Sequence, residues 1–182
     1  MRLFTERGID EVTIDEIAAA ADVGKGTIYN YFHTKEDIVV AFMAEFERDV
    51  QAQLARLDIA GRALRDTLAE FLRLQFRLKE PHHKFVRVFL GQMFLRTEQF
   101  LPYMAEIHTL TLPAAETLFE SLQKRGVLRA DVSVADLVLV FTNMQLGLTA
   151  LWAIEGPPFH GTSYAIEREI TLFCEGLEVR AS

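Results

Sequence analysis

Side chains whose tips can hydrogen-bond to nucleic acid gather within seven residues of this sequence. They are Lys25, Thr27, Tyr29, Asn30 and Tyr31. If residues 25–31 form a helix, Ile28 and Phe32 face inward together because they are four residues apart, and the polar side chains face outward. Ammonium, hydroxyl and amide groups contact phosphate oxygens and base edges, and Gly26 lets the backbone approach the bases. The pattern predicts a DNA-binding surface.

Two short helices joined by a tight turn are predicted to position this surface. Thr13 and Glu16 have the spacing of a capping box, which starts a helix at Ile14. Asp22-Val23-Gly24 then breaks the helical pattern, and Val23 is expected to be buried. A three-residue turn with a glycine between two helices is typical of a helix-turn-helix motif, whose second helix can enter a major groove.

The segment from residue 3 to residue 42 resembles the head of the tetracycline-repressor (TetR) family of bacterial transcription regulators. The resemblance is carried by Gly24-Lys25-Gly26-Thr27-Ile28-Tyr29, then Phe32 and Thr34-Lys35-Glu36. It implies that base contacts are made by Lys25, Gly26 and Asn30, and phosphate contacts by Thr13, Thr27, Tyr29, Tyr31 and Lys35. It also implies a homodimer on a palindromic operator and a small-molecule effector. The alternative is a helical hairpin in an unrelated bundle, in which these polar residues are incidental.

Two features depart from that family pattern. The whole chain has a formal net charge of −7, and residues 1–46 hold four basic and nine acidic residues, a net charge of −5. DNA-binding heads are usually basic, so the acids are expected at helix starts or away from the groove face. The resemblance also implies a first helix of about four turns, whereas only Met1 to Arg7 precede Gly8, which predicts a truncated first helix.

The rest of the chain shows helical periodicity and no period-two alternation long enough for a strand, which predicts an all-α fold. A helix capped by Thr34 is expected to connect a DNA-binding domain, residues 1–46, to an effector-binding and dimerisation domain, residues 47–182, without a linker. Further helices are expected at 62–79, 83–97, 99–125 and 134–155, with breaks or kinks at Pro102 and Pro113. A last helix is expected to be capped by Ser163.

The body is rich in aromatic residues, with 14 phenylalanines in 182 residues. The resemblance implies an effector cavity between the connector helix and the next four helices, and this aromatic content suits an apolar or aromatic ligand. The expected lining residues are Phe71, Gln75, Phe89, Met93, Met104, His108, Asn143 and Trp152. Gln75, His108 and Asn143 would orient the ligand. The alternative is an ordinary filled core.

Basic residues between 62 and 96 are interpreted as a solvated face rather than a nucleic-acid patch, because acidic residues interleave with them. They are Arg62, Arg65, Arg73, Arg77, Lys79, Lys84, Arg87 and Arg96.

The last two predicted helices bear on whether the chain crosses a membrane and on where it forms a dimer. Residues 134–155 are as long and apolar as a membrane span, but Asp136, Asn143 and Gln145 interrupt them, so a buried helix is favoured. The last helix repeats apolar residues every three or four positions, which predicts a four-helix dimer interface. That seam consists of Ile166, Ile170, Phe173 and Leu177. Packing within the chain is the alternative.

No pattern of catalytic, metal-binding or cofactor-binding residues stands out. The sequence has no phosphate-binding loop and no Gly-x-Ser-x-Gly elbow, and its histidines lack ligand spacing. Cys174 is the single cysteine and no signal peptide is recognised, which predicts a cytoplasmic protein. Two other functions remain open: an effector-independent DNA-binding protein with a filled core, and a small-molecule-binding bundle with an impaired head.

Overall fold

The computed structural model describes residues 2–58, 61–95 and 97–177, with the backbone alone at 97, 99, 102, 104, 106–108, 110, 111 and 177. Within these ranges the regular elements are all helical, which confirms the all-α fold. The elements are α1 (Arg2–Arg7), α2 (Ile14–Ala20), α3 (Lys25–Tyr31), α4 (Lys35–Leu54), α5 (Leu64–Lys79), the 3-10 turn η1 (Glu80–His82), α6 (His83–Leu95), α7 (Thr97–Lys124), α8 (Val134–Glu155) and α9 (His160–Leu177).

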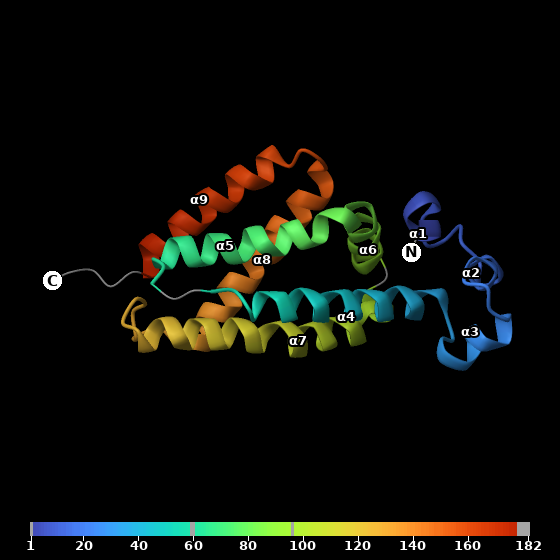
Figure 1. Ribbon diagram of the computed structural model, residues 1–182, viewed down its shortest axis with the longest axis horizontal. Helices are drawn as coiled ribbons and strands as arrows, with labels where there is room; N and C mark the ends of the chain where they lie inside the picture. Colours follow the sequence, from blue (N-terminus) through green and yellow to red (C-terminus); the bar gives the residue numbers. More distant parts are fainter. Residues whose placement is uncertain (1, 59–60, 96, 178–182) are drawn as a thin grey trace.

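Helices α1, α2 and α3 form a head at one end of an elongated molecule, as Figure 1 shows. The capping box predicted for α2 is present, since the Thr13 side chain accepts from the Glu16 backbone and Glu16 accepts from the Thr13 backbone. The same arrangement starts α4, where Thr34 and Asp37 are the partners. Local caps therefore fix where α2 and α4 begin.

Helix α4 leaves the head and runs along the body beside α7 (Figure 1). The first half of α4 belongs to an apolar cluster shared by head and body, and this joint cluster contains Phe4, Ile9, Val12, Val39, Met43, Ala44, Phe85, Phe89, Met93, Phe100 and Tyr103. Its second half, through Val50 and Leu54, packs into the body core formed with α5, α7, α8 and α9. Head and body consequently share packed side chains as well as the connector.

The prolines predicted to break or kink α7 do not break it. The helix runs without a break from Thr97 to Lys124, through Pro102 and Pro113. Each proline removes one backbone donor from the ladder, and the packing of α7 along α4 and α8 offsets that loss.

Helix α8 is long and apolar enough to cross a membrane by length and composition alone. It packs against α6, α7 and α9, and it buries Leu137, Phe141, Leu148 and Trp152. In this fold α8 is a core helix of the body, as its sequence pattern predicted.

Candidate DNA interface and effector cavity

Helix α3 presents its polar side chains to solvent. Every side chain of α3 except Ile28 is exposed, no residue of the helix is buried, and Tyr31 is 78% exposed. The backbone at Gly26 is open as well, because a Cβ added there would meet nothing within 4 Å. The prediction that Val23 is buried is wrong, because its side chain is 40% exposed.

Lys25 is held by an ion pair within the head. Its Nζ lies 2.7 Å from Asp15 Oδ1 on α2 and 5.9 Å from the centre of the Tyr29 ring. The hydrogen bond and the negative charge of Asp15 raise the pKa of Lys25. Both partners are largely exposed, so this contact is weak and a phosphate or a guanine edge can compete for the lysine.

Thr13 and Lys35, both expected at phosphates, have structural roles in the free head. The Thr13 hydroxyl lies in the capping box of α2. Lys35 Nζ donates to the backbone carbonyls of Asp10 and Val12, at 2.7 and 3.1 Å, and so fastens the loop between α1 and α2 to the start of α4. Phosphate contacts by these two residues stay predictions.

A cavity of about 160 Å³ lies between α4, α5, α6, α7 and α8, which are the connector helix and the next four. Four of the predicted lining residues lie in its wall: Gln75, Phe89, Met93 and Asn143. Met43 of α4 and Tyr103 of α7 also line it. With Phe89 and Met93 they belong to the joint cluster that holds the head.

The other predicted lining residues lie elsewhere. Trp152 is buried in the body core, where it stacks on Phe159 at 5.2 Å between ring centres, and it lines no cavity described here. Phe71 lines a second cavity near the far end of α4, of about 390 Å³, where the polar side chains among the described residues are Thr117 and Ser121. The side chains of Met104 and His108 lie outside the described residues.

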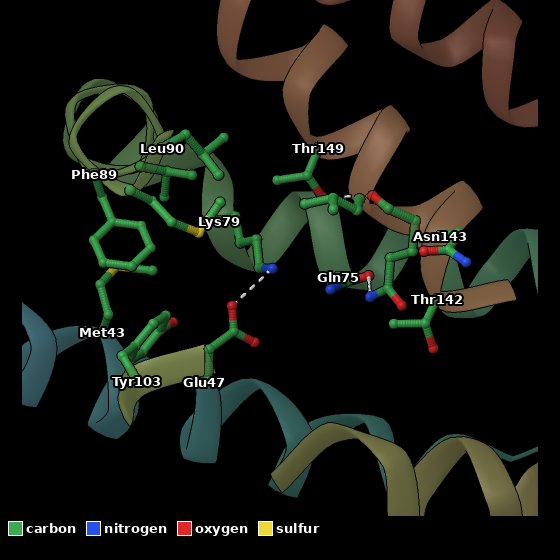
Figure 2. Close-up of a pocket in the computed structure, with 14 residues that line it drawn as sticks. Met43, Glu47, Gln75, Lys79, Phe89, Leu90, Tyr103, Thr142, Asn143 and Thr149 are labelled. Atoms are coloured by element: carbon green, nitrogen blue, oxygen red, sulfur yellow. Dashed lines mark hydrogen bonds and ion pairs between the residues drawn. The ribbon is translucent and has the colours of Figure 1, made fainter. Parts of the chain in front are cut away.

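Sequence reasoning missed a buried ion pair in the first cavity. Lys79 Nζ of α5 lies 2.8 Å from Glu47 Oε1 of α4, with both side chains less than a tenth exposed (Figure 2). Lys79 had been assigned to a solvated basic face, yet it follows Gln75 by one turn on the inward stripe of α5, and Glu47 follows Met43 by one turn on α4. That spacing was the available signal. Beside the pair, the Gln145 amide donates to the Gln75 carbonyl.

The sequence model of the family "Bacterial regulatory proteins, tetR family" matches residues 1–42, which include the whole helix-turn-helix motif. The "HTH-type transcriptional repressor KstR2" of Rhodococcus jostii is 26% identical to this chain over 134 residues. The match covers 72% of this chain and 65% of that relative, so the chain spans slightly less than two thirds of the relative's length. The chain belongs to the TetR family. The members of that family are transcriptional regulators with a DNA-binding head.

Solved TetR-type structures share the fold over the whole chain. Thermus thermophilus FadR, a TetR-family repressor solved with lauroyl-CoA, has a TM-score of 0.75 and 24% identity, covering 100% of this chain and 93% of that one. A TetR-type regulator from Syntrophomonas wolfei has a TM-score of 0.80 and 19% identity, covering 99% and 93%.

Two residues predicted for the dimer seam of this TetR-family chain are inside its own core. Ile166 is 4% exposed and Ile170 is fully buried, because α9 turns that stripe toward α5 and α8, so the prediction for these two residues is wrong. Phe173 is half-buried against Phe119 and Phe141, and the Leu177 side chain lies outside the described residues.

Helices α8 and α9 also carry exposed apolar side chains. We call these residues the outer face of α8 and α9: Leu139, Val140, Leu151, Ile154, Tyr164 and Leu172.

Proposed function

We propose that this TetR-family regulator is a repressor that binds a palindromic operator as a homodimer and releases it when a small apolar or aromatic effector enters the α4–α8 cavity. Helix α3 reads the major groove, with Lys25, Gly26 and Asn30 at base edges. The protein acts on DNA in the cytoplasm.

The observation that carries this proposal is the shared wall between cavity and head. Met43, Phe89, Met93 and Tyr103 line the cavity and also pack in the joint cluster with Phe4, Ile9, Val12 and Val39 of the head and connector. Because packed clusters do not deform continuously, a ligand that moves these wall residues must reposition the head.

The effect on DNA depends on differential binding. A ligand weakens operator binding only if it binds the DNA-incompetent arrangement more tightly, and typical coupling of about 1 to 3 kcal/mol shifts affinity roughly 5-fold to 150-fold. A tilt of α4 in each subunit would change the distance between the two α3 helices, which must fit half-sites about one helical turn apart.

The outer face of α8 and α9 supports the dimer. Its apolar residues, among them Leu151, Ile154 and Tyr164, are exposed on two neighbouring helices of the body. An apolar patch of this kind on two adjacent helices is typical of a self-complementary interface. Four helices, two from each subunit, would then bury it.

The cavity favours this function over an effector-independent protein with a filled core. FadR of Thermus thermophilus, whose fold this chain shares, was solved with a bound small molecule, lauroyl-CoA. A ligand-binding bundle with an impaired head is the remaining alternative, and the acidic head is the observation in its favour.

The test is selection of operator sites from random DNA duplexes, followed by affinity measurements on the enriched site. An enriched inverted repeat is expected. Lys25→Ala should lower affinity and relax base preference at one position per half-site by about 1 to 3 kcal/mol. Lys84→Ala, an exposed lysine on α6, is the matched control and should leave both unchanged. Failure to enrich any sequence would refute the proposal and favour the impaired head.

A further inference from the structure

The buried ion pair leaves one carboxylate oxygen without a donor. Among the described residues, three buried side-chain oxygens lack a hydrogen-bond partner, on Glu47, Gln51 and Gln92, and of these only Glu47 lines the cavity. Its Oε1 receives Lys79, while its Oε2 points away from the lysine (Figure 2). A buried acceptor without a donor is costly, so a ligand that supplies a donor there gains the difference.

Lys79 offers the complementary group. An ammonium has three donors, and within the described part of the chain Glu47 Oε1 is the acceptor that it contacts. A donor and an acceptor therefore lie side by side in the cavity wall, on two residues whose charges sum to zero.

This arrangement selects the charge of a ligand's polar group. A carboxylate that pairs with Lys79 comes to lie beside Glu47, and an ammonium that pairs with Glu47 lies beside Lys79, so either one buries like charges together at high cost. An uncharged hydroxyl has neither penalty, because it can accept from Lys79 Nζ and, once the buried Glu47 carboxylate turns to meet it, donate to Oε2.

The apolar part of the wall and the volume set the ligand's body. In Figure 2, Met43, Phe89, Leu90 and Tyr103 lie on one side of the ion pair, and all four line the cavity. Its volume is about 160 Å³, and an engineered apolar cavity of about 150 Å³ holds one benzene molecule. The space therefore fits a single ring with a small substituent.

We propose that the effector is a compact aromatic molecule with one uncharged hydroxyl, which bridges Glu47 Oε2 and Lys79 Nζ while its ring packs against the apolar wall. This inference rests on the proposed effector function of the same cavity. Since Glu47 is on the connector α4, the hydroxyl would contact the helix that carries the head.

The test is direct binding of four matched probes, measured by calorimetry on the full chain: para-ethylphenol, ethylbenzene, para-ethylbenzoate and para-ethylbenzylamine. Loss of the hydroxyl should weaken binding roughly tenfold to a hundredfold, as expected for a hydrogen bond to a charged group. The two charged probes should not bind where the phenol saturates. In the double variant Glu47→Leu/Lys79→Met the preference for the phenol over ethylbenzene should vanish, whereas Lys124→Met, at an exposed pair on α7, should keep it.

Equal binding of phenol and ethylbenzene by the wild type, or tighter binding of a charged probe, would overturn the inference, whether or not the double variant folds. Operator affinity without probes, measured on the same samples, separates this failure from that of the proposed function. If the probes bind in the expected order but no operator is bound, the ligand inference stands and the regulator function fails.

Discussion

Replacing Lys79 with methionine should destabilise the protein more than any exposed lysine replacement does. The change leaves Glu47 charged, 6% exposed and without its partner. Breaking a buried ion pair by removing one partner costs about 3 to 5 kcal/mol. With a urea slope of about 2 kcal/mol per molar, the unfolding midpoint should fall by roughly 1.5 to 2.5 M.

The matched comparison separates burial from charge. Lys124→Met removes an exposed pair with Glu120 and should change the free energy of unfolding by less than about 1 kcal/mol. The double variant Glu47→Leu/Lys79→Met should recover most of the loss, because apolar residues of similar size replace buried ion pairs at little cost. A Lys79→Met midpoint within 0.5 M of wild type (about 1 kcal/mol at this slope), or a double variant as unstable as the single one, would refute the buried-pair reasoning.

Three further outcomes are expected from the head and the outer face. Asp15→Asn should free Lys25 and raise operator affinity by up to about 5-fold, which is the strength of an exposed ion pair. The control Asp66→Asn on α5 should leave the affinity unchanged. A lower affinity of Asp15→Asn would show instead that the ion pair orients Lys25 for DNA binding. Ile154→Asp should give monomers in sedimentation at micromolar concentration, and a full dimer would move the interface elsewhere. The hydrogen bond from Arg7 lowers the pKa of Glu16 to about 2, so the stabilisation of the head by ionised Glu16 is complete above about pH 4.5 and is lost as pH falls toward 2. Amide hydrogen exchange in the head should speed up over the same pH range, and Glu16→Gln should flatten that pH dependence. A Glu16→Gln profile identical to that of the wild type would contradict this role of Glu16.

The sequence predicted best those features that depend on neighbouring residues. The capping boxes at Thr13 and Thr34 set the starts of α2 and α4 because donor and acceptor are three residues apart. The start of α9 was missed for the opposite reason. Glu155, at the end of α8, accepts from the backbone of Gly161 and Thr162, so α9 begins at His160 and Ser163 lies within it.

Side-chain partners across helices could not be predicted from periodicity. A helical stripe shows that Ile166 and Ile170 face one way, but the identity of the facing element depends on how α9 lies on α5 and α8. The same holds for Glu47 and Lys79, which are 32 positions apart in sequence and meet only in the fold. The cavity's five helices were predicted, whereas its ion pair required the structure.

The most direct test of the central claim is a fluorescence-anisotropy titration of the selected operator with the wild-type protein, with and without saturating para-ethylphenol. The shared wall between cavity and head predicts that the phenol weakens operator binding roughly 5-fold to 150-fold. A phenol that raises the melting temperature of the protein and leaves operator affinity unchanged would contradict the coupling of cavity to head.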